Sequence, residues 1–349
     1  MTTVRSLLAL GAALALGLAG PGCDAAGAPD GGADGATDGG AFRVVGFTDL
    51  PSADPRSHEL SGLGWDEGAQ TLWAVTNGAA RLHRLLPDAD FTGFTLADGL
   101  AVTGAGPWDG EGLARAAAGF YCANELGPAV LPVDGAGAAG AGIALPAHFA
   151  QARSNKSLES LSLSPDGRTL FTMNEAALSS DGPLATATGG TRLRLLRVEL
   201  TTGAQTERAY LTDPLPGAGG GSLGVSDIAA LSATRVIVME RGFEPGVGNS
   251  ARLFRVDIDQ GPEVIAEAAL SDAIAVLPKE LLLDLAALPG QGFPEPPEPQ
   301  PTRVLANYEG IALGPTLADG TRLLFLVSDD NSRSSQLARV LVLGTAAGL

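Results

Sequence analysis

Residues 159–175 read ESLSLSPDGRTLFTMNE, and the pattern of this stretch decides the fold. Glu159 begins a short run of Ser and Leu, the tetrapeptide Ser164-Pro165-Asp166-Gly167 supplies a turn, and an apolar run follows that ends at Glu175. Short apolar runs bounded by Pro, Gly and Asp are typical of neighbouring β-strands. We therefore interpret the stretch as two strands joined by a turn, with an acid at each end.

The same pattern occurs five times in the chain. The five segments are Glu59–Asn77, Glu111–Glu125, Glu159–Glu175, Asp227–Glu240 and Glu309–Asp329. Their leading acids are roughly 50 residues apart at first and further apart later, a spacing that suits four-stranded propeller blades with loop insertions. Further strand-like runs that would form outer strands of blades are Leu193–Leu200, Ala251–Ile258 and Val340–Leu343.

The sequence therefore predicts an all-β domain over residues 42–349, a β-propeller with six blades. The sixth blade is expected to span Ala251–Leu305, which contains no repeat of its own. Helical periodicity is nearly absent, and Pro278–Leu288 is predicted as a short helix. The Pro-rich segment Pro289–Pro301 is predicted as an extended surface loop.

The first 41 residues predict export. Arg5 precedes an apolar run, Leu7–Leu18, which is too short to span a bilayer and is followed by small residues up to Cys23. We interpret residues 1–22 as a signal peptide, Cys23 as the lipidated residue of a bacterial lipoprotein, and residues 23–41 as this Cys with a flexible tether. The protein would be lipid-anchored in the cell envelope, on the periplasmic or outer-membrane face. Plain secretion is the alternative.

The formal net charge of −17 limits the partners. Nucleic acids and anionic lipid surfaces need clustered Lys and Arg, so we expect no nucleic-acid partner and no membrane contact except through the lipid anchor. Cations are the more natural partners, although acidity also keeps an exported protein soluble. With Cys23 acylated, Cys122 is the only remaining thiol, which excludes an intramolecular disulfide, and we expect it in the core. We expect a monomer.

Equivalent positions of successive blades form a ring around one axis, because the inner strand of each blade faces the central channel. The leading acids that would converge there are Glu59, Glu111, Glu159, Asp227 and Glu309. A second set that would form an adjacent layer is Asn77, Glu125, Glu175, Glu240 and Asp329. The alternative is that each acid caps a turn or binds backbone amides within its own blade.

Carboxylates so close together need a positive counter-charge. Ca²⁺, which takes 6–8 oxygen ligands, is one candidate, with Glu59, Glu111, Asp227, Glu309 and Asp329 as ligands. The basic side chains near the motifs are the other candidates: Arg153, Lys156, Arg241 and Arg333.

Several of these segments resemble the phytase-like domain family, described as having esterase-like activity. The segments that carry the resemblance are Glu59–Leu63, Asn155–Leu161 with Ser164–Gly167 and Asn174-Glu175, Asp227-Ile228, Glu240-Arg241, Asn307–Ile311 and Ser328–Asn331. They occur in the family's order from about Phe42 to Leu343. Asn77 and Ser332-Arg333 depart from the pattern. The resemblance implies a propeller fold and an esterase or phosphoric ester hydrolase activity.

A metal-assisted hydrolysis would use the cation to polarise a phosphoryl oxygen and activate water, with a carboxylate as base. The residues predicted to carry catalysis are Glu159, Glu175, Glu240 and Arg241. Those predicted to contact a small-molecule ester or phosphoester are Lys156, Arg333 and Asn331. Acids without a nearby basic residue would instead favour cation binding or a lactonase-like propeller. Converging Arg and Lys side chains would favour phosphate.

Other catalytic signatures are weak. Gly220–Gly224 matches the nucleophile-elbow pattern around Ser222, but it lies in a Gly-rich run without the strand and helix that the pattern needs. None of the three His residues stands in a paired metal-ligand spacing. Besides a hydrolase, a non-catalytic propeller that binds a cation, a metabolite or a protein partner remains an alternative.

Overall fold

The computed structural model describes residues 42–217, 219–346 and 349, and their architecture is all-β. The predicted signal peptide, the lipidated Cys23 and the tether lie outside the described residues. Among the residues that are described, no helix is long and apolar enough to cross a membrane.

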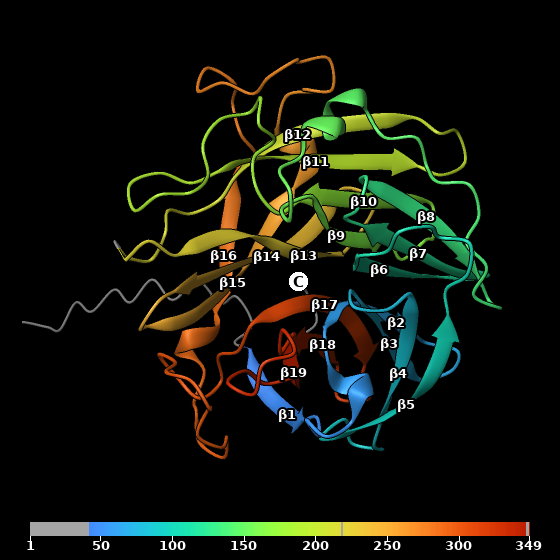
Figure 1. Ribbon diagram of the computed structural model, residues 1–349, viewed down its shortest axis with the longest axis vertical. Coiled ribbons are helices and arrows are strands. Elements are labelled where there is room, and N and C mark those ends of the chain that lie inside the picture. Colours follow the sequence, from blue (N-terminus) through green and yellow to red (C-terminus); the bar gives the residue numbers. More distant parts are fainter. Residues whose placement is uncertain (1–41, 218, 347–348) are drawn as a thin grey trace, which may run out of the picture. The chain divides into compact units, whose positions relative to one another are not determined.

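The described strands form five antiparallel sheets around a common centre (Figure 1). Blade 1 contains β2 (Leu60–Asp66), β3 (Thr71–Thr76), β4 (Arg81–Pro87) and β5 (Phe94–Ala101). Blade 2 contains β6 (Gly110–Ala116), β7 (Gly119–Asn124) and β8 (Ala129–Asp134). Blade 3 contains β9 (Leu158–Leu163), β10 (Thr169–Asn174), β11 (Arg192–Glu199) and β12 (Gln205–Leu211).

Blade 4 contains β13 (Ser222–Ala230), β14 (Arg235–Glu244), β15 (Gly248–Asp257) and β16 (Lys279–Asp284). Blade 5 contains β17 (Tyr308–Thr316), β18 (Thr321–Ser328), β19 (Arg339–Ala346) and, from the other end of the chain, β1 (Arg43–Asp49). Short 3-10 helices in the connections are η1 (Pro55–Ser57), η2 (Ala147–Gln151), η3 (Ile258–Gln260) and η4 (Leu285–Ala287).

The prediction of a β-propeller is confirmed, but the predicted number of six blades is wrong. The segment expected to form a sixth blade, Ala251–Leu305, contributes most of β15 and all of β16 to blade 4. Strand β15 pairs with β14 along its whole length, from Asp257 opposite Arg235 to Gly248 opposite Glu244. Because β15 and β16 complete a sheet that β13 and β14 begin, the described chain has no strands left for a sixth blade.

The short helix predicted for Pro278–Leu288 is also wrong. The segment forms β16 and then η4, and β16 pairs with β15 through Leu281 opposite Phe254. A short Leu-rich run suits either a strand or a helix, and here the backbone pairing with β15 decides. The predicted loop Pro289–Pro301 is confirmed, since it contains no strand or helix.

The core lies between the faces of neighbouring blades. Leu63 of blade 1 shares an apolar cluster with Phe325 and Val340 of blade 5. Leu113 and Cys122 of blade 2 belong to the cluster that blade 2 shares with blade 1. Cys122 is fully buried, and burial raises the pKa of its thiol to about 12, so it is a core residue as expected.

The first strands of the blades, β2, β6, β9, β13 and β17, lie side by side around the centre. Three glycines allow this close approach. A Cβ atom at Gly62 would lie 2.5 Å from a backbone oxygen of blade 2, and one at Gly310 would lie 2.5 Å from a backbone oxygen of blade 1. A Cβ atom at Gly112 would lie 2.7 Å from the Cβ atom of Leu161 in blade 3. A side chain at any of these three positions would therefore keep the inner strands apart.

Strand β1 closes the ring by pairing with β19. The fully buried Arg339 of β19 donates two hydrogen bonds to the carboxylate of Asp49 on β1, the longer one 2.9 Å. The guanidinium of Arg339 also lies over the rings of Phe47 and Phe293, 5.3 and 4.9 Å from their centroids. A partly buried ion pair and two cation–π contacts thus hold the closing strand in addition to the backbone ladder.

Replacing Arg339 with Ala should destabilise the protein, because it removes a fully buried guanidinium together with its hydrogen bonds to Asp49 and its contacts with two aromatic rings. We expect a loss of about 2–3 kcal/mol in the free energy of unfolding, which urea denaturation would measure. The control is Arg43→Ala, also at the closing sheet, whose exposed side chain lies 3.9 Å from Asp319 and should change stability by less than about 0.5 kcal/mol. Equal effects of the two changes would contradict this account of the closure.

Candidate functional site

A pocket of about 320 Å³ lies at the end of the central channel where the inner strands begin. The carboxyl groups that line it belong to Asp109, Glu111, Glu159, Glu175, Glu298, Glu309 and Asp329. We call it the acidic pocket. Three of the five predicted leading acids meet here with three members of the second set, Asn77, Glu175 and Asp329, and the six come from blades 1, 2, 3 and 5.

Two basic side chains supply positive charge within the acidic pocket. Lys156 Nζ lies 2.8 Å from Glu175 Oε2. Arg241 of β14 reaches across to blade 5, with its Nη2 atom 2.8 Å from Glu309 Oε1, and it lies 3.7 Å from Glu175 Oε1. The counter-charge that the sequence analysis required is thus provided in part by side chains of the chain itself.

Two glutamates of the pocket are strongly perturbed. Burial raises the pKa of Glu159 well above its usual value, and the nearby carboxyl groups of Glu111, Glu175 and Glu309 add to the rise. Burial likewise raises the pKa of Glu111, with Glu309 contributing. The carboxyl group of Glu159 forms no hydrogen bond or ion pair with another described residue, whereas Glu111 accepts a hydrogen bond from Asn77. Burial and the neighbouring carboxyl groups therefore favour the protonated form of Glu159.

Asp329 lies on the blade 5 side of the pocket, directly after β18. Burial raises the pKa of its carboxyl group to about 7, and the neighbouring Glu309 adds to the rise. A hydrogen bond of 2.7 Å from the backbone N–H of Asn331 opposes it. Burial also raises the pKa of Glu309, against the effect of Arg241. Asp329 is thus a group that titrates close to neutral pH.

Asp227, predicted as a metal ligand, does not line the acidic pocket. Its fully buried carboxylate accepts backbone N–H groups from three blades, those of Leu161, Ile228 and Ile311, at 3.2, 2.8 and 2.8 Å. The carboxylate links the inner strands of blades 3, 4 and 5, which have no backbone ladder between them. Asp227 therefore binds backbone amides, as the alternative interpretation of the acids predicted. The difference is that two of the three amides belong to neighbouring blades.

Glu240, predicted as catalytic, also lies outside the acidic pocket. It points between blades 3 and 4, where its carboxylate accepts hydrogen bonds from the Tyr210 hydroxyl and from Lys279 Nζ, both at 2.6 Å. The backbone N–H of Asp213 gives a third, at 2.9 Å. Glu240 is 2% exposed and accepts three hydrogen bonds. We therefore assign it a structural role between the two blades.

The remaining predicted residues lie at the pocket or at its edge. Lys156, Asn331 and Arg333, predicted as substrate contacts, all line the pocket. Glu59 is not part of the lining, and its Oε1 atom accepts a hydrogen bond from Ser332 at 3.0 Å. Arg153 points elsewhere, because its guanidinium donates to the carbonyl oxygens of Ala177 and Gly182.

Sequence reasoning missed several lining residues, among them Asp109, Ser222 and Asn249. Asp109 stands two residues before the leading acid of the second repeat, and this position could have revealed it. Ser222 begins β13 rather than a turn before a helix, which agrees with the rejection of a nucleophile elbow, but it does line the pocket. Asn249 stands on an outer strand, where no repeat pattern marks it.

The described residues contain no group of three or more His, Cys, Asp or Glu side chains arranged to hold a metal ion. In the acidic pocket, Lys156 and Arg241 occupy oxygen atoms of Glu175 and Glu309 that a cation would need. The predicted ligand Glu309 is thus bound by Arg241 in this arrangement. Ca²⁺ at this site stays a prediction, and we derive no chemical step through it.

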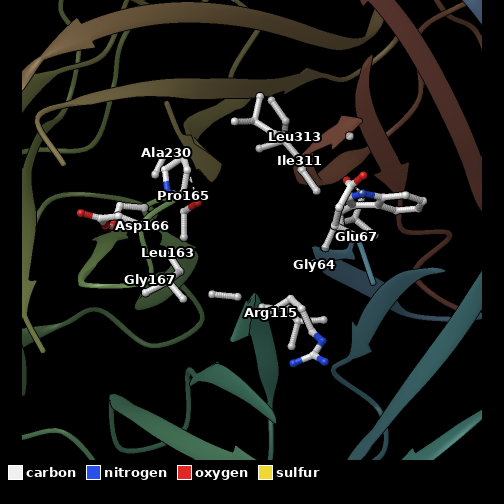
Figure 2. A pocket seen from close by; sticks show the side chains of 18 of the residues that line it. Gly64, Glu67, Arg115, Leu163, Pro165, Asp166, Gly167, Ala230, Ile311 and Leu313 are labelled. Atoms are coloured by element: carbon white, nitrogen blue, oxygen red, sulfur yellow. Dashed lines mark hydrogen bonds between the residues drawn. The ribbon is translucent and has the colours of Figure 1, made fainter. Parts of the chain in front are cut away.

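A second pocket, of about 420 Å³, lies at the opposite end of the channel (Figure 2). The ends of all five inner strands line it through Gly64, Arg115, Leu163, Ala230 and Leu313. Its two acids, Glu67 and Asp166, are exposed, and Arg115 is bound by the carboxylate of Asp66 at 2.8 Å. The buried carboxyl cluster is thus confined to one end of the channel.

The fold and the pocket define a five-bladed β-propeller with buried acids at one channel mouth. Residues 55–332 match the family model named phytase-like, with the description "Esterase-like activity of phytase". The match covers most of the chain, so the protein belongs to the phytase-like family, as its motifs indicated.

Comparison with solved structures finds other proteins at low identity. The endo-arabinase from Bacteroides thetaiotaomicron VPI-5482 is 12% identical with a TM-score of 0.47, over 88% of this chain and 98% of that one. The PQQ-bound aldose sugar dehydrogenase from Streptomyces coelicolor is 14% identical with a TM-score of 0.39, over the same shares. The gluconolactonase XC5397 from Xanthomonas campestris is 12% identical with a TM-score of 0.36, again over these shares. These likenesses are too low to indicate an activity. No match to this sequence is found among the curated proteins.

Asp329→Asn should stabilise the protein at alkaline pH. Because the folded-state pKa is about 7, the native state holds a proton that the unfolded state has released, so wild-type stability falls as the pH rises from about 4 to about 7. The substitution removes the cost of ionising a buried carboxyl group, which is up to about 4 kcal/mol of the free energy of unfolding at about pH 8. The amide oxygen of the new Asn side chain can still accept the N–H of Asn331. Urea unfolding at several pH values measures the difference.

The control is Asp134→Asn, a fully exposed carboxylate whose pKa is lowered by hydrogen bonds from the backbone N–H groups of Ala138 and Ala136. Its removal should leave the fall in stability between about pH 4 and about pH 7 in place. An Asp329→Asn variant that is less stable than the wild type at about pH 8 would show that Asp329 is not held protonated by burial.

Proposed function

We propose that the acidic pocket hydrolyses esters or phosphoesters by carboxyl acid–base catalysis. The observation that carries the proposal is the pairing of two neighbouring glutamates with different surroundings. Glu159 has a raised pKa and no hydrogen-bond partner, whereas Glu175 is the carboxylate of ion pairs with Lys156 and Arg241. Two carboxyl groups whose environments differ in this way suit the roles of acid and base.

In the proposed reaction, the Glu175 carboxylate takes a proton from a water molecule whose oxygen attacks the carbonyl carbon or phosphorus of the ester. The bond from that atom to the leaving oxygen breaks, and Glu159 gives its proton to the leaving oxygen. Arg241, which is near both acids, stabilises the negative charge that develops on the attacked group. The proton on Glu175 then returns to Glu159 through solvent, and the site is restored.

Ca²⁺ remains a prediction for this site, and the same assay tests it. Addition of Ca²⁺ or of a chelator should leave the proposed reaction running, since the scheme uses only side chains and water. Lactones are cyclic esters, so the alternative of a lactonase-like propeller calls for the same two carboxyl groups and is tested by including lactones among the substrates.

Glu159→Gln should lower kcat by at least about 100-fold on whichever ester the protein hydrolyses, because the amide cannot donate the proton that the leaving oxygen needs. The measurement is hydrolysis of a panel of carboxylate esters, phosphate monoesters and lactones by the full chain, with Ca²⁺ and with chelator. The matched control is Glu280→Gln, an exposed acid at the outer edge of blade 4, which should keep the wild-type rate.

The wild-type rate should also fall as the pH rises through the raised pKa of Glu159, because a smaller fraction of Glu159 is then protonated and able to donate its proton. Absence of turnover on every member of the panel, or full activity in Glu159→Gln, would rule out the proposal. The protein would then be a propeller that binds its partner without catalysis.

A further inference from the structure

The acidic pocket contains more negative than positive groups. Seven carboxyl side chains and three basic side chains line it. Lys156 and Arg241 are committed to Glu175 and Glu309, and Arg333 is exposed at the rim. No Lys or Arg among the described residues forms an ion pair with the four remaining inner acids, Asp109, Glu111, Glu159 and Asp329. This half of the pocket has room for a cation.

Blade 4 builds one wall of the pocket. Its strands β13, β14 and β15 have 9, 10 and 10 residues, longer than the inner strands of the blades 1, 2 and 3. In the added length, Ser222 pairs with Phe243, and Phe243 pairs with Asn249. The three residues form a row across three strands, and all three line the pocket. The row places a hydroxyl, an aromatic ring and an amide beside the acids.

The amide of Asn249 has unfilled hydrogen-bonding capacity. The residue is 1% exposed, yet neither its side-chain oxygen nor its side-chain nitrogen has a hydrogen-bond partner. A buried polar group without a partner destabilises the protein, so its presence needs an explanation. The Nε atom of Arg241, two residues from Phe243, also lacks a partner. Unfilled donors and acceptors beside an uncompensated acidic cluster are what a bound ligand would satisfy.

We propose that the substrate of the acidic pocket is an ester that carries a compact organic cation, such as a substituted ammonium group. This inference rests on the proposed hydrolysis and adds the class of substrate. The ammonium group would lie among the unpaired acids and against the face of Phe243, which attracts cations through its ring electrons. The Asn249 side-chain oxygen would accept an N–H of the ammonium group, and its NH₂ group would donate to the ester carbonyl oxygen.

The test compares two esters of the same shape, dimethylammonioethyl acetate and isopentyl acetate, in which a protonated nitrogen replaces a carbon. The full chain should hydrolyse the ammonium ester with a kcat/KM at least about tenfold higher, as expected for about 1.4 kcal/mol of added binding. Equal rates on the two esters would overturn the cation inference and leave the hydrolase intact.

Two variants separate recognition from folding. Asn249→Leu should abolish most of the preference while keeping or raising the melting temperature, because it removes an unsatisfied buried amide. Phe243→Leu should lower the preference by removing the ring. A melting temperature that falls in Asn249→Leu, with the preference unchanged, would assign the residue a structural role and overturn the inference.

Failure of the hydrolase proposal is distinguishable from failure of this inference. If neither ester is hydrolysed, calorimetry with dimethylammonioethanol decides. Binding that is lost in Asn249→Leu would support a cation site in a non-catalytic propeller. Absence of binding would overturn the cation site as well.

Discussion

The close approach of five inner strands around one axis is the constraint on which the rest of the structure depends. Gly62, Gly112 and Gly310 allow the strands to pack with backbone against backbone, and the acids next to Gly112 and Gly310, Glu111 and Glu309, are thereby brought to one channel mouth. Side-chain carboxylates also replace the backbone ladder that is missing between blades, as the three-blade contact of Asp227 shows. The repeated acids thus serve the ring and the pocket at the same time.

The chain handles its buried negative charge in three ways. Some acids are fully bound and structural, such as Glu240 with Tyr210 and Lys279. Others, such as Glu309, have an Arg partner that spans two blades. Those at the channel mouth, Glu159 above all, have neither, and their pKa rises instead. A group that is left chemically unsatisfied inside a well-packed ring costs stability, and such positions are where function is expected.

The inner half of the fold could be predicted from the sequence, and the outer half could not. The five repeats are the two inner strands of the five blades, because these strands carry the channel-facing acids that make the pattern visible. Outer strands carry no repeated acid, so the sequence of β15 and β16 was interpreted as a sixth blade. No sequence pattern indicated that β1 pairs with β19. In the site, Asp227 and Glu240 share the motif with Glu159, but distant segments such as Lys279, which no repeat encodes, determine their contacts. Asn249 belongs to an outer strand and was missed for the same reason.

The central claim is that burial at the channel mouth keeps carboxyl groups protonated at a pH where free glutamic acid is ionised. Infrared difference spectroscopy between the wild type and Glu159→Gln, recorded at about pH 6, observes this directly, because a protonated carboxyl group has a carbonyl stretch that a carboxylate lacks. We predict such a band in the wild type and its loss in the variant. A wild-type spectrum that shows only ionised carboxylates at this pH would contradict the account.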